Sequence, residues 1–150
     1  MVLSWRFFLD RIPTRDNLRR WNIVFLDGLL ACVYCEAVEE SVNHLFLHCR
    51  VVMGIWSNLM RWLGITFLMP PILYIHWECW SMETRRKRLR KGFWVIWRAA
   101  IWVIWIKRNH RIFRNVLMEA EELVEEIKVL AWRWSLSWLN IPTCLYNEWC

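Results

Sequence analysis

Three cysteines and one histidine lie close together in the first third of the chain. They are Cys32, Cys35, His44 and Cys49, spaced as C-x2-C-x8-H-x4-C. Two cysteines separated by two residues can turn both sulfurs toward one ion, and a His and a Cys downstream can complete a tetrahedron. Three thiolates and one imidazole suit zinc, and a filled set of four ligands leaves no position for a substrate water. The spacing therefore predicts one Zn2+ ion with a structural role.

Other interpretations of these residues remain open from the sequence. Free cysteines are among the most buried residues, so the group could be ordinary core, and a disulfide is a second alternative that fits secreted proteins better. The fourth ligand is also ambiguous. On an unbroken helix His44 shares a face with His48 and not with Cys49. Either the backbone bends before Cys49 or His48 is the fourth ligand, and we favour Cys49.

Composition bounds the class of protein. The chain has 150 residues, enough for one compact domain or for a small domain with a helical extension. It is 57% hydrophobic with 14 Trp, and only 4 Gly and 4 Pro, which disfavours a hairpin-rich β architecture. The net charge of +6 favours an anionic partner, either nucleic acid or a membrane surface. The N-terminus lacks the features of a signal peptide. We therefore expect an intracellular protein of the nucleus or cytoplasm, not a secreted one.

The most hydrophobic run covers residues 93–106 and is interrupted by Arg98. A helix of that length reaches about 20 Å, which is short of the roughly 30 Å hydrocarbon layer of a membrane. We therefore expect a buried core helix. A membrane-associated protein anchored by this run is the alternative.

Helical periodicity predicts a mostly helical, all-α fold. Thr14 can cap a short helix. Apolar residues recur at helical spacing after Cys49, and Gly64 can end that helix. We expect one long helix over residues 83–114 and, capped by Asn115, a further helix to about Leu139. These two should pack as a long antiparallel hairpin after a small zinc-knuckle module. The expected organisation is a zinc-binding domain at 1–70, a linker at 71–82, the helical hairpin at 83–140 and a tail at 141–150.

Charge along the hairpin gives a second expectation. If the two helices fold back around Asn115, Glu119 to Glu126 lie opposite Lys107, Arg108 and Arg111. The basic run over residues 85–91 would instead lie opposite residues 139–145, which contain no acid. That run should therefore remain an unpaired positive patch.

The order of these motifs resembles a known family. The phrases are R-I-P-T-R-D-N-L-R-R-W (Arg11 to Trp21), C-V-Y-C, E-S-V-N-H-L-F-L-H-C and then Trp56. Together they resemble the zinc-binding domain found after the reverse transcriptase of plant LINE-type (non-LTR) retrotransposons. The resemblance implies the same four metal ligands. It also implies an N-terminally truncated domain, because the family domain begins further upstream. The segment from Trp102 to Phe113 resembles the segment located after this domain in many such polyproteins.

The carboxylates do not favour catalysis. The aspartates Asp10, Asp16 and Asp27 include no adjacent pair that could hold two catalytic metal ions. We expect a zinc-stabilised, nucleic-acid-binding accessory module without catalysis of its own. Its partners would be RNA or DNA, contacted at phosphates, and by resemblance the reverse transcriptase portion of a parent polyprotein. The candidate phosphate contacts are Arg15, Arg19, Arg20, Arg85, Arg86, Lys87, Arg88, Arg90 and Lys91. The alternative is a structural or protein-interaction module, or a relic reading frame, in which zinc only stabilises the fold.

Overall fold

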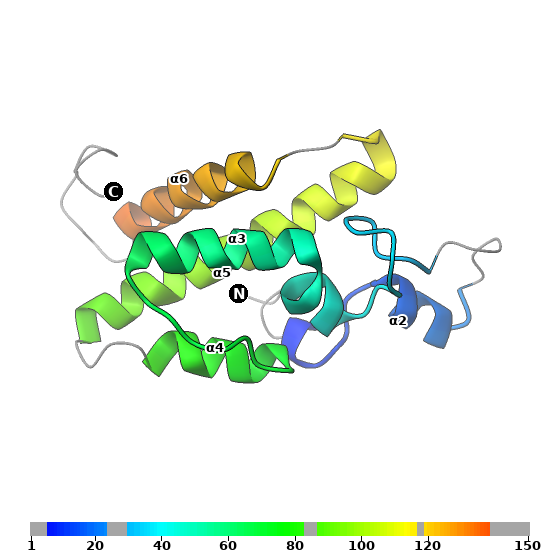
Figure 1. Ribbon diagram of the computed structural model, residues 1–150, viewed down its shortest axis with the longest axis horizontal. Coiled ribbons are helices and arrows are strands. Elements are labelled where there is room, and N and C mark those ends of the chain that lie inside the picture. The colour runs from blue at the N-terminus through cyan, green and yellow to red at the C-terminus, as the bar shows by residue number, and fades with distance from the viewer. Residues whose placement is uncertain (1–5, 24–29, 83–86, 117–118, 139–150) are drawn as a thin grey trace.

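The computed structural model describes residues 6–23, 30–82, 87–116 and 119–138, and most of these residues are helical (Figure 1). Within these ranges there is no sheet, and the strand-like pairing is an isolated bridge between Ala31 and Glu39. The all-α prediction is therefore confirmed. The helices are α2 (Arg15–Arg20), the π-helix η1 (His44–His48), α3 (Arg50–Leu63), α4 (Leu73–Met82), α5 (Lys87–Arg114) and α6 (Ala120–Trp138).

Helix α5 runs lengthwise through the molecule, and α4 and α6 pack along it (Figure 1). Helix α6 returns antiparallel to α5, as the hairpin prediction required, and α3 packs against α6. Helix α4 is also antiparallel to α5, because its residues meet α5 in reverse order: Trp80 lies against Phe93, and His76 lies against Trp97. The two helical hairpins thus share α5 as their common member.

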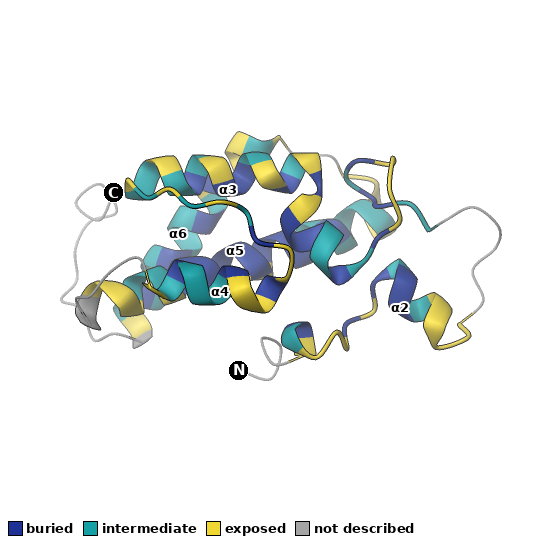
Figure 2. Cartoon of the chain, turned by 60° about the horizontal axis from the view of Figure 1, so that its bottom comes forward, coloured by how far each residue is buried: buried dark blue, intermediate teal, exposed yellow. Residues whose placement is uncertain are grey.

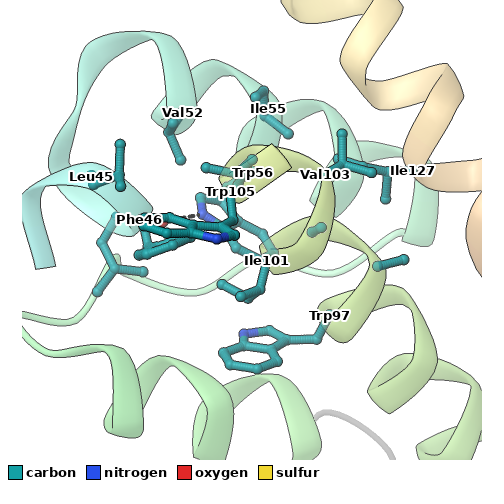
Figure 3. Close-up of a cluster of buried hydrophobic side chains, with 14 of the residues drawn as sticks. Leu45, Phe46, Val52, Ile55, Trp56, Trp97, Ile101, Val103, Trp105 and Ile127 are labelled. Atoms are coloured by element: carbon teal, nitrogen blue, oxygen red, sulfur yellow. Dashed lines mark hydrogen bonds between the residues drawn. The ribbon is translucent and has the colours of Figure 1, made fainter. Parts of the chain in front are cut away.

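The apolar run predicted as a core helix forms the buried middle of α5. Figure 2 shows this part of α5 in dark blue beneath its neighbours. Trp97, Ile101 and Ile104 are each at most 2% exposed. Figure 3 shows Trp97, Ile101 and Trp105 in one cluster with Trp56 from α3. No helix in the described part of the chain is long and apolar enough to cross a membrane.

Helix α3 agrees closely with its sequence pattern. Val52, Ile55 and Leu59 recur at three- and four-residue spacing and are fully buried. The helix ends at Gly64, which has a φ of 66° and so occupies the left-handed conformation that glycine adopts without steric cost. Both the helix and its end were predicted correctly.

Residues 71–82, expected to be a linker, mostly form α4. The helix is docked through His76, whose Nδ1 accepts a hydrogen bond of 3.0 Å from Trp97 Nε1 of α5. Burial lowers the pKa of His76 to about 3, so the ring stays neutral near pH 7. Helix α4 was missed because buried Leu73, His76 and Trp80 are interspersed with other large apolar residues, which hides the helical period.

Asn115 ends α5 instead of capping α6. It has a φ of 51°, and its amide donates to the carbonyl of Arg111 at 3.2 Å. Asparagine tolerates this left-handed conformation better than most residues, so it suits a helix end as well as a helix start. The expected long helix begins at Lys87 in the structure; residues 83–86 lie outside the described part.

Candidate metal centre

A tight turn presents the first two cysteines. The amide of Glu36 donates to the carbonyl of Cys32 at 2.8 Å, and Glu36 adopts a left-handed φ of 56°. The amide of Cys32 donates to the carbonyl of Val38 at 2.7 Å, which closes a small hairpin. We call residues 31–40 the knuckle loop. Its backbone places Cys32 and Cys35 side by side, as the C-x2-C spacing predicts.

A π-helix resolves the ambiguity between Cys49 and His48. The amide of Cys49 bonds to the carbonyl of His44 at 2.7 Å, five residues back, and Cys49 itself is extended with a ψ of 128°. This wider turn brings His44 and Cys49 to the same side, which a regular α-helix would not do. His48 is exposed, and its Nε2 lies 3.1 Å from the carbonyl of Pro71. The backbone therefore bends before Cys49, as the choice of Cys49 over His48 as the fourth ligand required.

The four predicted ligands converge on one point. Their donor atoms all lie within 4.8 Å of one another. Cys32 Sγ lies 3.9 Å from Cys49 Sγ, and Cys35 Sγ lies 3.2 Å from His44 Nε2. Ideal zinc bond lengths place two sulfurs of a tetrahedron about 3.8 Å apart and a sulfur and a nitrogen about 3.6 Å apart. The sulfur–sulfur separation matches its ideal value and the sulfur–nitrogen separation is slightly shorter than its own, so the cluster is consistent with one zinc ion. The sulfur distance is far too long for a disulfide.

The electrostatics of the cluster favours a thiolate at Cys49 and a neutral ring at His44, and it disfavours a thiolate at Cys32. The Cys32 thiol donates to Cys49, which together with burial raises the pKa of Cys32. The same contact lowers the pKa of Cys49, helped by the backbone amides of Val51 and Val52 at the start of α3. Burial lowers the pKa of His44, which keeps the ring neutral as a metal ligand must be. The donor set therefore matches the chemistry of structural zinc.

Three contacts fasten the knuckle loop to one face of α5. Tyr34, between the two cysteines, donates its hydroxyl to the carbonyl of Ile104 at 2.8 Å. Glu36 accepts from Arg111 at 2.7 Å, and Glu40 pairs with Arg108. The α5 positions 104, 108 and 111 are four and three residues apart, so they share one face of the helix. The zinc ligands thus sit on a loop that α5 holds in place.

The pairing of Arg108 and Arg111 corrects the charge prediction for the hairpin. Lys107 does meet Glu126 of α6 at 2.6 Å, as expected. Arg108 and Arg111 instead turn toward the knuckle loop. Counting residues from the turn gives the level of each side chain along the hairpin but not the face from which it projects.

A buried ion pair between Glu40 and Arg108 was not predicted from the sequence. The two side chains are 0% and 5% exposed. Arg108 Nε lies 3.2 and 3.3 Å from the two carboxylate oxygens, and the guanidinium lies over the Trp105 ring. The amide of Arg15 donates to the same carboxylate at 3.1 Å. No local motif could have indicated this pair, because its members are far apart in the chain.

The basic residues of α2 are present on the surface but are engaged with acids. Arg19 pairs with Asp16 at 3.0 Å and with Glu39 at 3.2 Å. Arg20 pairs with Asp10 at 3.0 Å and with Asp16 at 2.6 Å, and Arg15 donates to the carbonyl of Ala31. Thr14 caps the helix as predicted, accepting from the amide of Asn17 at 3.4 Å. Much of the positive charge predicted here is therefore balanced within the molecule.

The second predicted basic cluster lies at the start of α5. Arg90 and Lys91 are exposed there, and neither has an acidic partner among the described residues. Arg85 and Arg86, the side chains of Lys87 and Arg88, and the tail expected to face the cluster all lie outside the described part.

Comparison with known proteins agrees with the geometry of the metal centre. Residues 1–56 match the family model described as zinc-binding in reverse transcriptase. The matched range contains all four converging ligands. No curated protein and no solved structure matches the chain.

Proposed function

We propose that this chain, whose residues 1–56 are a zinc-binding domain of the kind found in reverse transcriptases, is an accessory module that binds nucleic acid. Its parent would be a retrotransposon polyprotein of the plant LINE type, and the module would hold template or target for a catalytic domain elsewhere. The Cys32–Cys35–His44–Cys49 centre would bind one structural Zn2+. The family match covers only a zinc-binding domain. That this chain has no catalytic activity of its own is therefore part of the proposal.

One observation supports this function best: the exposed, acid-free basic start of α5. Arg90 and Lys91 continue a run in which nearly every residue from 85 to 91 is Arg or Lys. Helix α5 contains no Asp or Glu at all between Lys87 and Arg114. Such cations bind phosphates without reading sequence, and binding releases counterions. The ion-paired arginines of α2 would contribute less, because their acidic partners must first be displaced.

Binding to single-stranded RNA should depend steeply on salt, and part of that dependence should belong to Arg90 and Lys91. The double variant Arg90→Gln/Lys91→Gln should flatten the log–log salt slope by about 1.4, since each phosphate contact on a single strand contributes about 0.7. Fluorescence anisotropy of a labelled RNA across a salt series measures this slope.

A matched control removes the same charge from α2. The variant Arg19→Gln/Arg20→Gln also loses two cations, but both are already paired with acids. It should change the slope by less than the α5 variant. Equal slopes for the wild type and the α5 variant would exclude this cluster as the contact surface.

A protein-interaction module is the second candidate, and exposed apolar side chains support it. Leu68 is 93% exposed, and Met82 and Phe113 are each 80% exposed. A partner such as the reverse transcriptase portion of the polyprotein could cover them. Binding that is indifferent to salt, or no RNA binding at all, would favour this candidate.

A further inference from the structure

A ridge of alternating cationic and aromatic side chains runs along α5. Its members are Arg90, Trp94, Arg98 and Trp102, each four residues after the last. Residues four apart on a helix adjoin, so the ridge is continuous and winds slowly around the helix over about 18 Å. We call these four residues the Arg–Trp ridge. Arg90, Trp94 and Trp102 are exposed, and Arg98 is partly exposed.

The tryptophans of the ridge differ from the core tryptophans of the same helix. Trp94 and Trp102 are 37% and 39% exposed, whereas Trp97 and Trp105 are 1% and 8% exposed. The Arg98 guanidinium lies 5.0 Å from the centre of the Trp94 ring. Part of each ridge tryptophan is thus left toward solvent, and a cation lies over the Trp94 ring.

Helix α4 extends and orients this surface. Trp94 Nε1 donates to Ser81 Oγ at 2.9 Å, which fixes the ring against α4. The Trp77 ring lies 5.6 Å from Trp94, and Tyr74 lies 5.8 Å from Trp77. Glu78, the acid of α4, interacts with Tyr74 and raises the pKa of that tyrosine.

We propose that the Arg–Trp ridge is a binding site for single-stranded nucleic acid. Unpaired bases would stack on Trp94 and Trp102, and Arg90 and Arg98 would contact the phosphates between them. Every base offers a π-face, so aromatic rings interleaved with cations bind single strands with little sequence preference. This inference rests on the proposed function and sharpens it. Duplex bases are already stacked on one another, so the ridge should discriminate single strands from duplexes.

The test compares a labelled oligouridylate with an RNA duplex of the same length at one salt concentration. Trp94→Leu and Trp102→Leu should each weaken single-strand binding about fivefold or more and change duplex binding less than twofold. Trp94→Phe should retain most of the affinity because it keeps a ring. Phe113→Leu is the matched control, because Phe113 is an exposed aromatic of the same helix outside the ridge, and it should have no effect. Circular dichroism melting checks that each variant is folded.

A second readout locates the contact without any substitution. Oligouridylate containing 5-bromouridine should photocross-link to peptides that contain Trp94 or Trp102. Cross-links only elsewhere would overturn the proposal, as would an equal loss of single-strand and duplex binding. Trp102→Leu provides a second test of the ridge should Trp94→Leu fail to fold.

The outcomes separate this inference from the function on which it rests. If Arg90→Gln/Lys91→Gln weakens binding but neither tryptophan variant does, the ridge is wrong and the proposed function stands. If the wild-type chain binds no nucleic acid, both fail. If the tryptophan variants change only the sedimentation of the chain, the ridge is an interface between protein chains and the proposal is overturned.

Discussion

Replacing Arg108 with Met is expected to lower the free energy of unfolding by about 3–5 kcal/mol. Glu40 is fully buried, and the substitution leaves its carboxylate without its guanidinium partner in a poorly solvated site. Methionine keeps most of the side-chain volume, so the effect should come from the orphaned charge more than from a cavity. Urea unfolding of the zinc-loaded protein, monitored by circular dichroism, measures this loss.

Two further variants separate burial from charge. Lys107→Met removes the neighbouring ion pair with Glu126, whose carboxylate side chain is 41% exposed, and should cost less than about 1 kcal/mol. The double variant Glu40→Gln/Arg108→Met removes the buried negative charge as well and should recover part of the stability. A loss below about 1 kcal/mol for Arg108→Met alone would show that this pair does not hold the knuckle loop on α5.

Replacing Cys35 with Ser should reduce the bound zinc to near zero. A structural zinc site contributes about 10–16 kcal/mol of binding free energy in zinc-finger peptides, and that energy depends on all four ligands. Loss of the ion should also loosen the contact that the knuckle loop makes with α5 through Tyr34. Metal analysis of the purified variant measures the first effect, and thermal unfolding measures the second.

His48→Ala is the matched control for the ligand assignment. His48 is four residues from His44 but is turned toward Pro71, so its removal should leave the zinc content unchanged. Full zinc occupancy in Cys35→Ser would rule out the site. Loss of zinc in His48→Ala would mean that His48 replaces Cys49 as the fourth ligand.

The metal centre was largely predictable because ligand chemistry and spacing are local. The C-x2-C turn, the capping Thr14, and α3 with its terminal Gly64 each depend on residues near one another in the chain. The choice between Cys49 and His48 was only partly predictable, because periodicity assumes a regular helix and the chain forms a π-helix there. Asn115 was misassigned because its side chain suits either end of a helix.

Contacts between distant segments were beyond the reach of the sequence. Glu40 and Arg108 each look like ordinary surface residues, and only the fold brings them together in the core. Helix α4 carries no clear polar face, so its period was hidden. The contacts between the knuckle loop and α5 also show that the structural unit around the metal centre extends beyond the range of the family match. The match stops at residue 56, yet the knuckle loop is held by side chains and a carbonyl of α5.

Zinc K-edge X-ray absorption of the purified protein tests the central claim most directly. One zinc per chain should be bound by three sulfurs at about 2.3 Å and one nitrogen at about 2.0–2.1 Å. That result would establish Cys32, Cys35, His44 and Cys49 as a closed structural site. Two sulfurs with two nitrogens, or a shell of light atoms with no sulfur, would contradict it.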